Sequence, residues 1–333
     1  MTQLKPTVLD RDNKARDVVK YPILIHQAIT VNFVDPAIYK DDNGTWYAFA
    51  TNNTAGILHQ PGNGTAVDYG RSNIQLATST DFLNWILHKS IQDPLPQVGA
   101  WANRDVSNST GIQRANVWAP DVLRRSSNGR FVTYYSAAAG NTTTNHCIGA
   151  AVSTNYSPAG PYRSLPGSIA CPTNVGGAID PTAFIDSDGA IYVAYNVDGN
   201  NHGNGGICGN CVAPIMPTPI LLQRMEGDGV TPRGPAVQIL DRVSEDGPLV
   251  EAPQLVRSAE GVSFLFFSSG CTRAPSYDVK YATAMKITGL STRAESELLQ
   301  TGDWDLQAPG SVGVRWDHVA ERFLGLGVIL LFK

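Results

Sequence analysis

Three carboxylates occupy matching places beside a recurring proline. Asp35 and Asp180 each directly precede a proline, and Glu251 lies two positions before one. Carboxylates that share one cavity repel each other, so at least one of them holds a proton and its pKa rises. Such a set performs general acid–base catalysis near neutral pH. An Asp before proline also caps turns and a Glu near a strand start is often a solvated edge residue, but here coincidence would have to recur three times.

The proline belongs to a unit that returns five times along the chain. In the first four units a glycine follows eight or nine residues after the proline, and an aromatic run comes next. A strand, a glycine turn and a second strand are the signature of a β-hairpin. A second recurring segment, at residues 76–82 and 150–156, supplies an outer strand. The five units lie at residues 35–39, 119–123, 180–184, 252–256 and 308–312.

Hairpins that repeat at intervals of 56 to 84 residues predict an all-β fold, a five-bladed β-propeller. The alternative is a β-sandwich in which the proline and glycine spacing is coincidental. Innermost strands begin near the propeller axis, so the three carboxylates converge on one face. We expect residues 1–20 to be an N-terminal extension and 21–333 a single catalytic domain. Asp317 and His318 replace the fifth turn glycine, so we expect the last blade to be atypical or truncated after about residue 312.

Composition excludes several classes of partner. The 333 residues carry a net charge of −4, 16% are charged, and no basic run exceeds two residues, so neither nucleic acid nor an anionic membrane is expected. The longest apolar run, residues 323–332, is half the length that spans a bilayer, which predicts a soluble protein. The six histidines lack metal-ligand spacing, and neither a Gly-X-Ser-X-Gly elbow nor a Walker loop is present.

Five cysteines leave at least one free thiol if the others pair. Cys208 and Cys211 have the spacing of a metal or redox motif, but no second pair supports that use, so we expect loops tied by disulfides. Cys147–Cys171 is one expected pair, and Cys271 joins Cys208 or Cys211.

Glycosylation sequons favour an extracellular protein. Residues 1–20 lack the apolar core of a signal peptide, so either the signal was removed or the gene start is placed late. Six Asn-X-Ser/Thr sequons nevertheless predict a secreted glycoprotein. The sequons begin at Asn43, Asn52, Asn63, Asn108, Asn141 and Asn155.

Four motifs around the prolines, at residues 32–36, 118–122, 177–181 and 250–253, resemble the hallmark motifs of glycoside hydrolase family 43. The resemblance runs from about residue 20 to residue 312. It implies a five-bladed propeller that cleaves arabinose- or xylose-containing plant polysaccharides with inversion at the anomeric carbon. The expected partner is therefore a plant polysaccharide or oligosaccharide, and we expect a monomer.

The resemblance also implies roles for individual residues. Asp35 corresponds to the general base, Glu251 to the general acid, and Asp180 to the residue that raises the pKa of the acid and orients it. An inverting enzyme needs its acid and base roughly 6.5–9.5 Å apart. Trp118 is expected to face the pocket and stack on a sugar, although a core position between blades is equally compatible with its place. Asn196 is expected at the cleft rim, with the loops at 198–202 and 203–219.

One departure from the family concerns a metal. Several arabinan-cleaving members carry a Pro-Gly-His motif in the fifth blade, where the histidine helps to hold an axial ion, whereas Ser311 follows Pro309-Gly310 here. We therefore expect no bound metal and no other cofactor.

Three functions remain open from the sequence. The leading hypothesis is an exo-acting α-L-arabinofuranosidase or β-xylosidase, because the long inserts can block one end of a groove, and an endo-1,5-α-L-arabinanase is its alternative. A retaining fructan hydrolase is a second possibility, but its Asn-Asp-Pro-Asn-Gly opening is replaced by residues 34–37. A carbohydrate-binding propeller without catalysis is the third.

Overall fold

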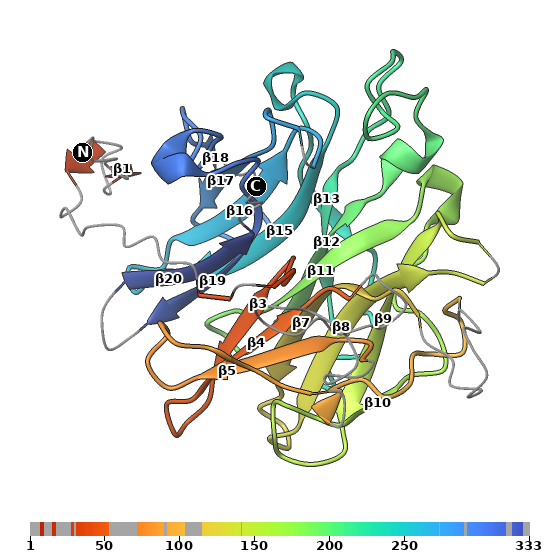
Figure 1. The fold of residues 1–333 in the computed structure, drawn as a ribbon, viewed down its shortest axis with the longest axis vertical. Coiled ribbons are helices and arrows are strands. Elements are labelled where there is room, and N and C mark those ends of the chain that lie inside the picture. Colours follow the sequence, from red (N-terminus) through yellow and green to blue (C-terminus); the bar gives the residue numbers. More distant parts are fainter. Residues whose placement is uncertain are drawn as a thin grey trace.

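The computed structural model describes residues 7–9, 15–17, 28–29, 31–52, 72–89, 92–103, 115–140, 142–272, 274–289, 292–317 and 322–328 of the chain. Four antiparallel four-stranded sheets, with their strands in sequence order, are arranged around one axis (Figure 1). This is the all-β propeller that the repeats predict, with four blades of four strands. A separate hairpin, β1 (Thr7–Leu9) with β2 (Ala15–Asp17), lies near the N-terminus.

Each blade runs outward from the axis along the chain. The blades are β3 (Ala37–Lys40), β4 (Trp46–Ala50), β5 (Gln75–Ser79) and β6 (Ile86–Leu87); β7 (Trp118–Arg124), β8 (Phe131–Ala138), β9 (His146–Ser153) and β10 (Tyr162–Ser164); β11 (Ala178–Ile185), β12 (Ile191–Val197), β13 (Ile220–Arg224) and β14 (Val237–Leu240); β15 (Val250–Arg257), β16 (Ser263–Ser269), β17 (Asp278–Ala284) and β18 (Thr292–Arg293). Short 3-10 turns lie between strands at η3 (Thr173–Val175), η4 (Gly199–His202), η5 (Ser244–Asp246) and η6 (Asp303–Asp305).

A two-stranded sheet, β19 (Gly310–Asp317) with β20 (Arg322–Val328), follows the fourth blade. Strand β19 contacts β15 of the fourth blade and β3 of the first, so the innermost strands contact one another in a closed circuit. This arrangement covers the free edge of each innermost strand with the neighbouring one.

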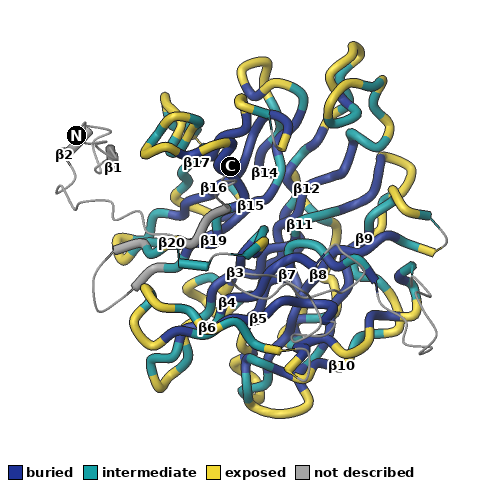
Figure 2. Tube along the Cα trace, in the orientation of Figure 1, coloured by how far each residue is buried: buried dark blue, intermediate teal, exposed yellow. Residues whose placement is uncertain are grey.

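The core consists of apolar layers between adjacent blades (Figure 2). The second strands of blades two to four, β8, β12 and β16, are buried along their whole length. A strand covered on both faces needs a nearly continuous apolar sequence rather than an alternating one. The aromatic runs detected in the sequence are these strands.

The innermost strands share a β-bulge, a point at which the pairing register shifts. In the last sheet this bulge lies at a different residue from the one that the fifth sequence unit predicts. In blades two to four, pairing shifts around Ala119, Asp180 and Ala252, whose φ values are 42°, 58° and 51°. In β19 the shift instead surrounds Ser311, with φ 49°, so the equivalent position is Ser311 and not Ala308. Pro309 is therefore not the equivalent of the repeated proline. In the other blades proline directly follows the bulged residue, whereas here Val312 follows it.

The cysteines pair as Cys147–Cys171 and Cys208–Cys271, which leaves Cys211 as an exposed free thiol. The first expected disulfide is confirmed, and Cys208 is the partner of Cys271. Among the described residues, no helix has the length and apolar character needed to cross a membrane.

The structure separates the described sequons. Asn43 and Asn155 are exposed. Asn52 is only 3% exposed and its Nδ2 donates to the Ser72 carbonyl, so this sequon is inaccessible in the folded chain. Asn63, Asn108 and Asn141 lie outside the described residues.

Candidate active site

The bulged residues form a ring at the start of the innermost strands. A left-handed φ is uncommon for a residue other than glycine and indicates a locally constrained backbone. The constraint turns each backbone N–H toward the preceding blade, where a side-chain oxygen accepts it. The four bonds are Ala119 N to Thr51 Oγ1 at 2.8 Å, Asp180 N to Ser136 Oγ at 3.0 Å, Ala252 N to Asp180 Oδ2 at 3.0 Å and Ser311 N to Ser268 Oγ at 2.8 Å.

A polar cavity of about 30 Å³ lies on the axis inside this ring. Its lining comes from all five innermost strands and includes Asp35, Asp180 and Ser311. A cavity of this size holds one or two water molecules and excludes a sugar ring. Asp35 and Asp180, which line this cavity, are only partly buried.

Asp35 is held by two hydroxyl groups. Thr51 Oγ1 donates to Asp35 Oδ2 at 2.6 Å, and the Ser311 side chain donates a second hydrogen bond to the same carboxylate. Burial raises the pKa of Asp35, while both hydroxyls favour the ionised form and oppose the rise. Asp35 is therefore a partly buried carboxylate whose raised pKa is opposed by two directed donors.

Glu251 lies directly before the bulge of β15 and has a different environment. The Tyr277 hydroxyl donates to Glu251 Oε1 at 2.6 Å. Burial raises the pKa of Glu251 to about 7, the Tyr277 bond lowers it, and the charges of Asp35 and Asp198 raise it. A carboxyl with this pKa holds a proton in slightly acidic solution, as a proton donor requires.

Asp180 links the two. Burial raises its pKa well above the ordinary value, and repulsion from Glu251 and then from Asp35 adds to the rise, while the Ala252 N–H lowers it. The structure thus brings the three predicted carboxylates into one electrostatically coupled group. Their mutual repulsion favours a state in which the group retains at least one proton near neutral pH.

Trp118 lies at the start of β7 and pairs with Ser136 of β8. Its half-buried ring meets His146 edge-on, with ring centroids 4.6 Å apart. His146 Nδ1 lies 2.5 Å from Asp198 Oδ2, which also accepts from Asn201 Nδ2 at 2.7 Å. His146 thus connects Trp118 to Asp198, whose charge raises the pKa of Glu251.

Asn196 is more deeply buried than the sequence predicts. It is only 2% exposed and pairs across the blade with Ile179, just before the Asp180 bulge. Within the described part of the chain its Oδ1 has no hydrogen-bond partner. Its position matches those of Ser136 and Ser268 in neighbouring blades, so it is a buried member of the ring rather than a rim residue.

Sequence reasoning missed four residues of the site. Thr51 and Ser311 hold Asp35, Tyr277 contacts Glu251, and His146 supports Trp118. Thr51 and Ser311 carry a signal in the repeat, since both occupy positions that recur in each blade. Ser311 stands where some arabinan-cleaving members have a metal-binding histidine, and its hydroxyl is engaged with Asp35. The residue present offers no imidazole, so this chain does not fit a site that depends on one.

Comparison with known proteins defines the family. The sequence profile described as "Glycosyl hydrolases family 43" matches residues 28–311. The chain therefore belongs to this family and is a glycosidase that hydrolyses O-glycosyl compounds. No curated protein sequence matches it significantly.

Solved structures share the fold. A thermostable family-43 glycoside hydrolase aligns with TM-score 0.64 and 21% identity, covering 85% of this chain and 78% of that one. An α-L-arabinofuranosidase from Lactobacillus brevis aligns with TM-score 0.61 and 16% identity over 88% and 82%. An endo-1,4-β-xylanase from Bacteroides thetaiotaomicron VPI-5482 aligns with TM-score 0.60 and 22% identity over 86% and 80%.

Proposed function

We propose that the protein is an inverting glycosidase that cleaves α-L-arabinofuranosyl or β-D-xylosyl linkages in plant cell-wall polysaccharides such as arabinan and arabinoxylan. The observation that carries the proposal is the contrast between two coupled carboxyls. Glu251 has a pKa of about 7, whereas Asp35 is stabilised as a carboxylate by Thr51 and Ser311. Carboxyls whose surroundings separate their titration are suited to opposite roles as acid and base.

In this mechanism Asp35 removes a proton from a water molecule that attacks the anomeric carbon. Glu251 gives its proton to the leaving glycosidic oxygen as the bond to that carbon breaks. Asp180 and Glu251 repel each other when both are ionised, which raises the pKa of Asp180, and Asp180 holds the strand that carries Glu251 by accepting the Ala252 N–H. At the end of the step Glu251 is ionised and Asp35 is protonated, and one proton passes to solvent and back to reset the pair.

We further infer that Trp118 stacks on the apolar face of a bound sugar. Its ring is half-buried and has an edge-on contact with His146, and its strand partner Ser136 accepts the Asp180 N–H. Asn196 contributes from below, where its buried Oδ1 is free to accept a hydrogen bond from a water molecule within the site.

We infer that β19 and β20 act as the fifth blade of a five-bladed propeller. The support is the position of β19 between β15 and β3 and the Ser311 bulge, which repeats the geometry of the other innermost strands. We also infer that residues 21–333 form a single catalytic domain and that the chain is a monomer.

Exo action is favoured by the insert at 203–219. The Cys208–Cys271 disulfide ties this insert to the loop that carries Tyr277, whose hydroxyl contacts Glu251, and we infer that the insert closes the Glu251 side of the site. A groove closed on one side accommodates chain ends better than chain interiors. Endo-1,5-α-L-arabinanase activity remains the alternative.

Secretion is a further part of the proposal. Two disulfides are characteristic of oxidising compartments, and the sequons at Asn43 and Asn155 are exposed. Expression in a secreting eukaryotic host should yield a protein whose mass falls on treatment with a glycosidase specific for N-glycans. An unchanged mass would contradict the glycoprotein assignment.

Product analysis by chromatography tests the substrate assignment. The protein is incubated with linear 1,5-arabinan, arabinoxylan and xylo-oligosaccharides, with circular dichroism confirming that it is folded. Free arabinose or xylose alone identifies an exo-glycosidase and its sugar, whereas an oligosaccharide ladder from arabinan identifies an endo-arabinanase. Binding without any product would favour the carbohydrate-binding alternative.

A further inference from the structure

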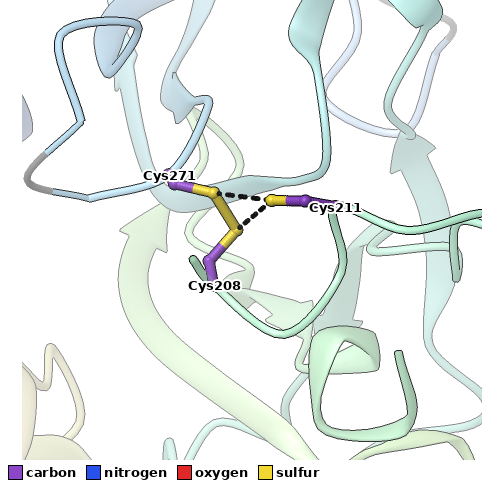
Figure 3. Close-up of side chains that lie close together, drawn as sticks. All are labelled: Cys208, Cys211 and Cys271. Atoms are coloured by element: carbon purple, nitrogen blue, oxygen red, sulfur yellow. Dashed lines mark hydrogen bonds between the residues drawn. A yellow bond between two sulfur atoms is a disulfide. The ribbon is translucent and has the colours of Figure 1, made fainter. Parts of the chain in front are cut away.

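Three sulfur atoms meet beside the proposed active site without a part in the mechanism above. Cys208 and Cys271 form a disulfide, and Cys211 Sγ lies 3.4 Å from Cys271 Sγ and 3.7 Å from Cys208 Sγ (Figure 3). Cys211 is a free cysteine and is exposed, so solvent and added reagents can reach its thiol. A free thiol next to a disulfide is the arrangement that thiol–disulfide exchange requires.

The disulfide lies at the start of a loop whose last residue, Tyr277, contacts the proposed acid Glu251. The loop leaves β16, begins with Cys271 and reaches Tyr277 just before β17. Two turns connect its ends, from Ala274 N to Cys271 O and from Tyr277 N to Ala274 O, each at 2.9 Å. Because the Tyr277 hydroxyl donates to Glu251, a bond at Cys271 restrains the contact to Glu251.

The turn that carries Cys208 and Cys211 is held in place at Asn210. Asn210, between them, is fully buried. Its side chain donates to the carbonyls of Met216 and Pro248 and accepts from Met216 N, with bonds of 2.7–3.0 Å. The turn is thus anchored at Asn210, with Cys208 bonded to Cys271 and Cys211 Sγ 3.4 Å from Cys271 Sγ.

Glycines in the surrounding backbone allow Cys211 to approach the disulfide closely. Gly206 and Gly209 adopt φ values of 94° and 79°, a region that glycine enters without steric cost. A Cβ on Gly206 would lie 2.4 Å from Cys211 Cβ, so only glycine permits the close approach of Cys211. In the observed state Cys211 Sγ lies beside the S–S bond, 3.4 Å from the Cys271 sulfur that it would attack.

We propose that these three cysteines form a disulfide clamp with two registers, Cys208–Cys271 and Cys211–Cys271, either of which holds the Tyr277 loop in place. The Cys211 thiol loses its proton and its sulfur attacks Cys271 Sγ. The Cys208–Cys271 bond breaks, and Cys208 leaves as a thiolate that takes up a proton. One disulfide and one thiol are present before and after, so no oxidant or reductant is consumed.

Linkage mapping tests the two registers without any assay of activity. Free thiols are alkylated, the protein is digested without reduction, and the linked peptides are identified by mass spectrometry, with Cys147–Cys171 as the internal control. Cys208→Ser should contain a Cys211–Cys271 disulfide, and Cys211→Ser should keep Cys208–Cys271. In the native chain, incubation near pH 8.5, about the ordinary pKa of a cysteine, should lead to alkylation at both Cys208 and Cys211. Two free thiols in Cys208→Ser, or alkylation of Cys211 alone in the native chain, would overturn the proposal.

The link to Glu251 rests on the proposed function and needs a separate measurement. The double variant Cys208→Ser/Cys211→Ser has no tether at Cys271, whereas each single variant retains one. Loss of the Tyr277 bond raises the pKa of Glu251, so the basic limb of the pH–rate profile should move upward by about one pH unit in the double variant only. An unshifted profile would refute the coupling to Glu251, and inactivity of the native chain on every substrate would refute the proposed function while leaving the linkage map decisive.

Discussion

The Tyr277 hydroxyl donates a 2.6 Å hydrogen bond to Glu251 Oε1 from a loop 26 residues further along the chain. The Tyr277 ring also packs against the start of β19, where a Cβ on Gly310 would lie 1.9 Å from Tyr277 Cε1. One side chain thus joins the fourth blade, the last sheet and the proposed acid. The position of Glu251 therefore depends on how the propeller closes.

Tyr277→Phe should shift the pH dependence of catalysis. The hydrogen bond stabilises the ionised form of Glu251, so its loss raises the pKa above the value of about 7. An acid that must be protonated then remains active to higher pH, and the basic limb of kcat/KM should move upward by about one unit. A pH profile of initial rates measures the shift. Movement of the basic limb to lower pH would contradict the assignment of Glu251 as the acid.

Ser311→Gly should move the acidic limb of the pH–rate profile. Glycine retains the left-handed φ of 49° without strain and removes the hydroxyl that stabilises the Asp35 carboxylate. The pKa of Asp35 therefore rises, and the acidic limb of the profile should move to higher pH while the basic limb stays in place. If the basic limb moved instead, the roles of Asp35 and Glu251 would have to be exchanged.

Asp180→Asn should increase stability at the expense of catalysis. The pKa of Asp180 is raised in the folded chain, so its charge opposes folding at pH values above that pKa. The opposition disappears as the pH falls toward the ordinary value of 3.8, where the group is protonated in both states. Asn retains an acceptor for the Ala252 N–H, so the variant should melt a few degrees higher than the native chain at pH 7 and above, and similarly near pH 4. Thermal melts of the variant and the native chain across this pH range test the argument about charge. Equal melting temperatures at pH 7 would contradict it.

Gly310→Ala should destabilise the closure of the ring. The added methyl group collides with the Tyr277 ring, and overpacking of this kind costs about 1–3 kcal/mol. Gly167→Ala is the matched control, because no atom lies within 4 Å of a Cβ built there. Denaturant unfolding of both variants measures the difference, and equal stabilities would show that Tyr277 and β19 are not packed together.

Local patterns predicted most of the fold, because each blade is encoded within its own segment. The proline, the glycine turn and the aromatic run specify a bulged strand and its hairpin partner within about twenty residues. The last sheet escaped this reasoning, since Ser311-Val312 makes the bulge without proline and Pro309 marks another register. A bulge is defined by backbone pairing across strands, which a single segment does not reveal.

The candidate site divides in the same way. Asp35, Asp180 and Glu251 were predictable because they stand at repeated positions of the inner strands. Tyr277 and His146 belong to outer strands or loops and reach the site only through the packing of neighbouring blades. Asn196 was expected at the rim because it ends a hairpin strand, but strand pairing places it in the buried ring.

Asp35→Asn tests the base directly. Replacing a positioned base removes about 10² or more of the rate, while binding of substrate should persist. Asp42→Asn is the control, because Asp42 is an exposed carboxylate that pairs with Arg124 on the surface. Rates and binding affinities on the sugar identified by product analysis separate the outcomes, and a variant that keeps most of its activity would remove Asp35 from the mechanism.

The central claim is that two carboxyls act on opposite sides of the sugar with a water between them, which requires inversion. Proton NMR of the first product, recorded before mutarotation, measures this directly. Cleavage of an α-L-arabinofuranoside should release the β-anomer first, and cleavage of a β-D-xyloside should release the α-anomer. Retention of the anomeric configuration would contradict the account, because it requires a covalent glycosyl-enzyme and a nucleophile in place of the base.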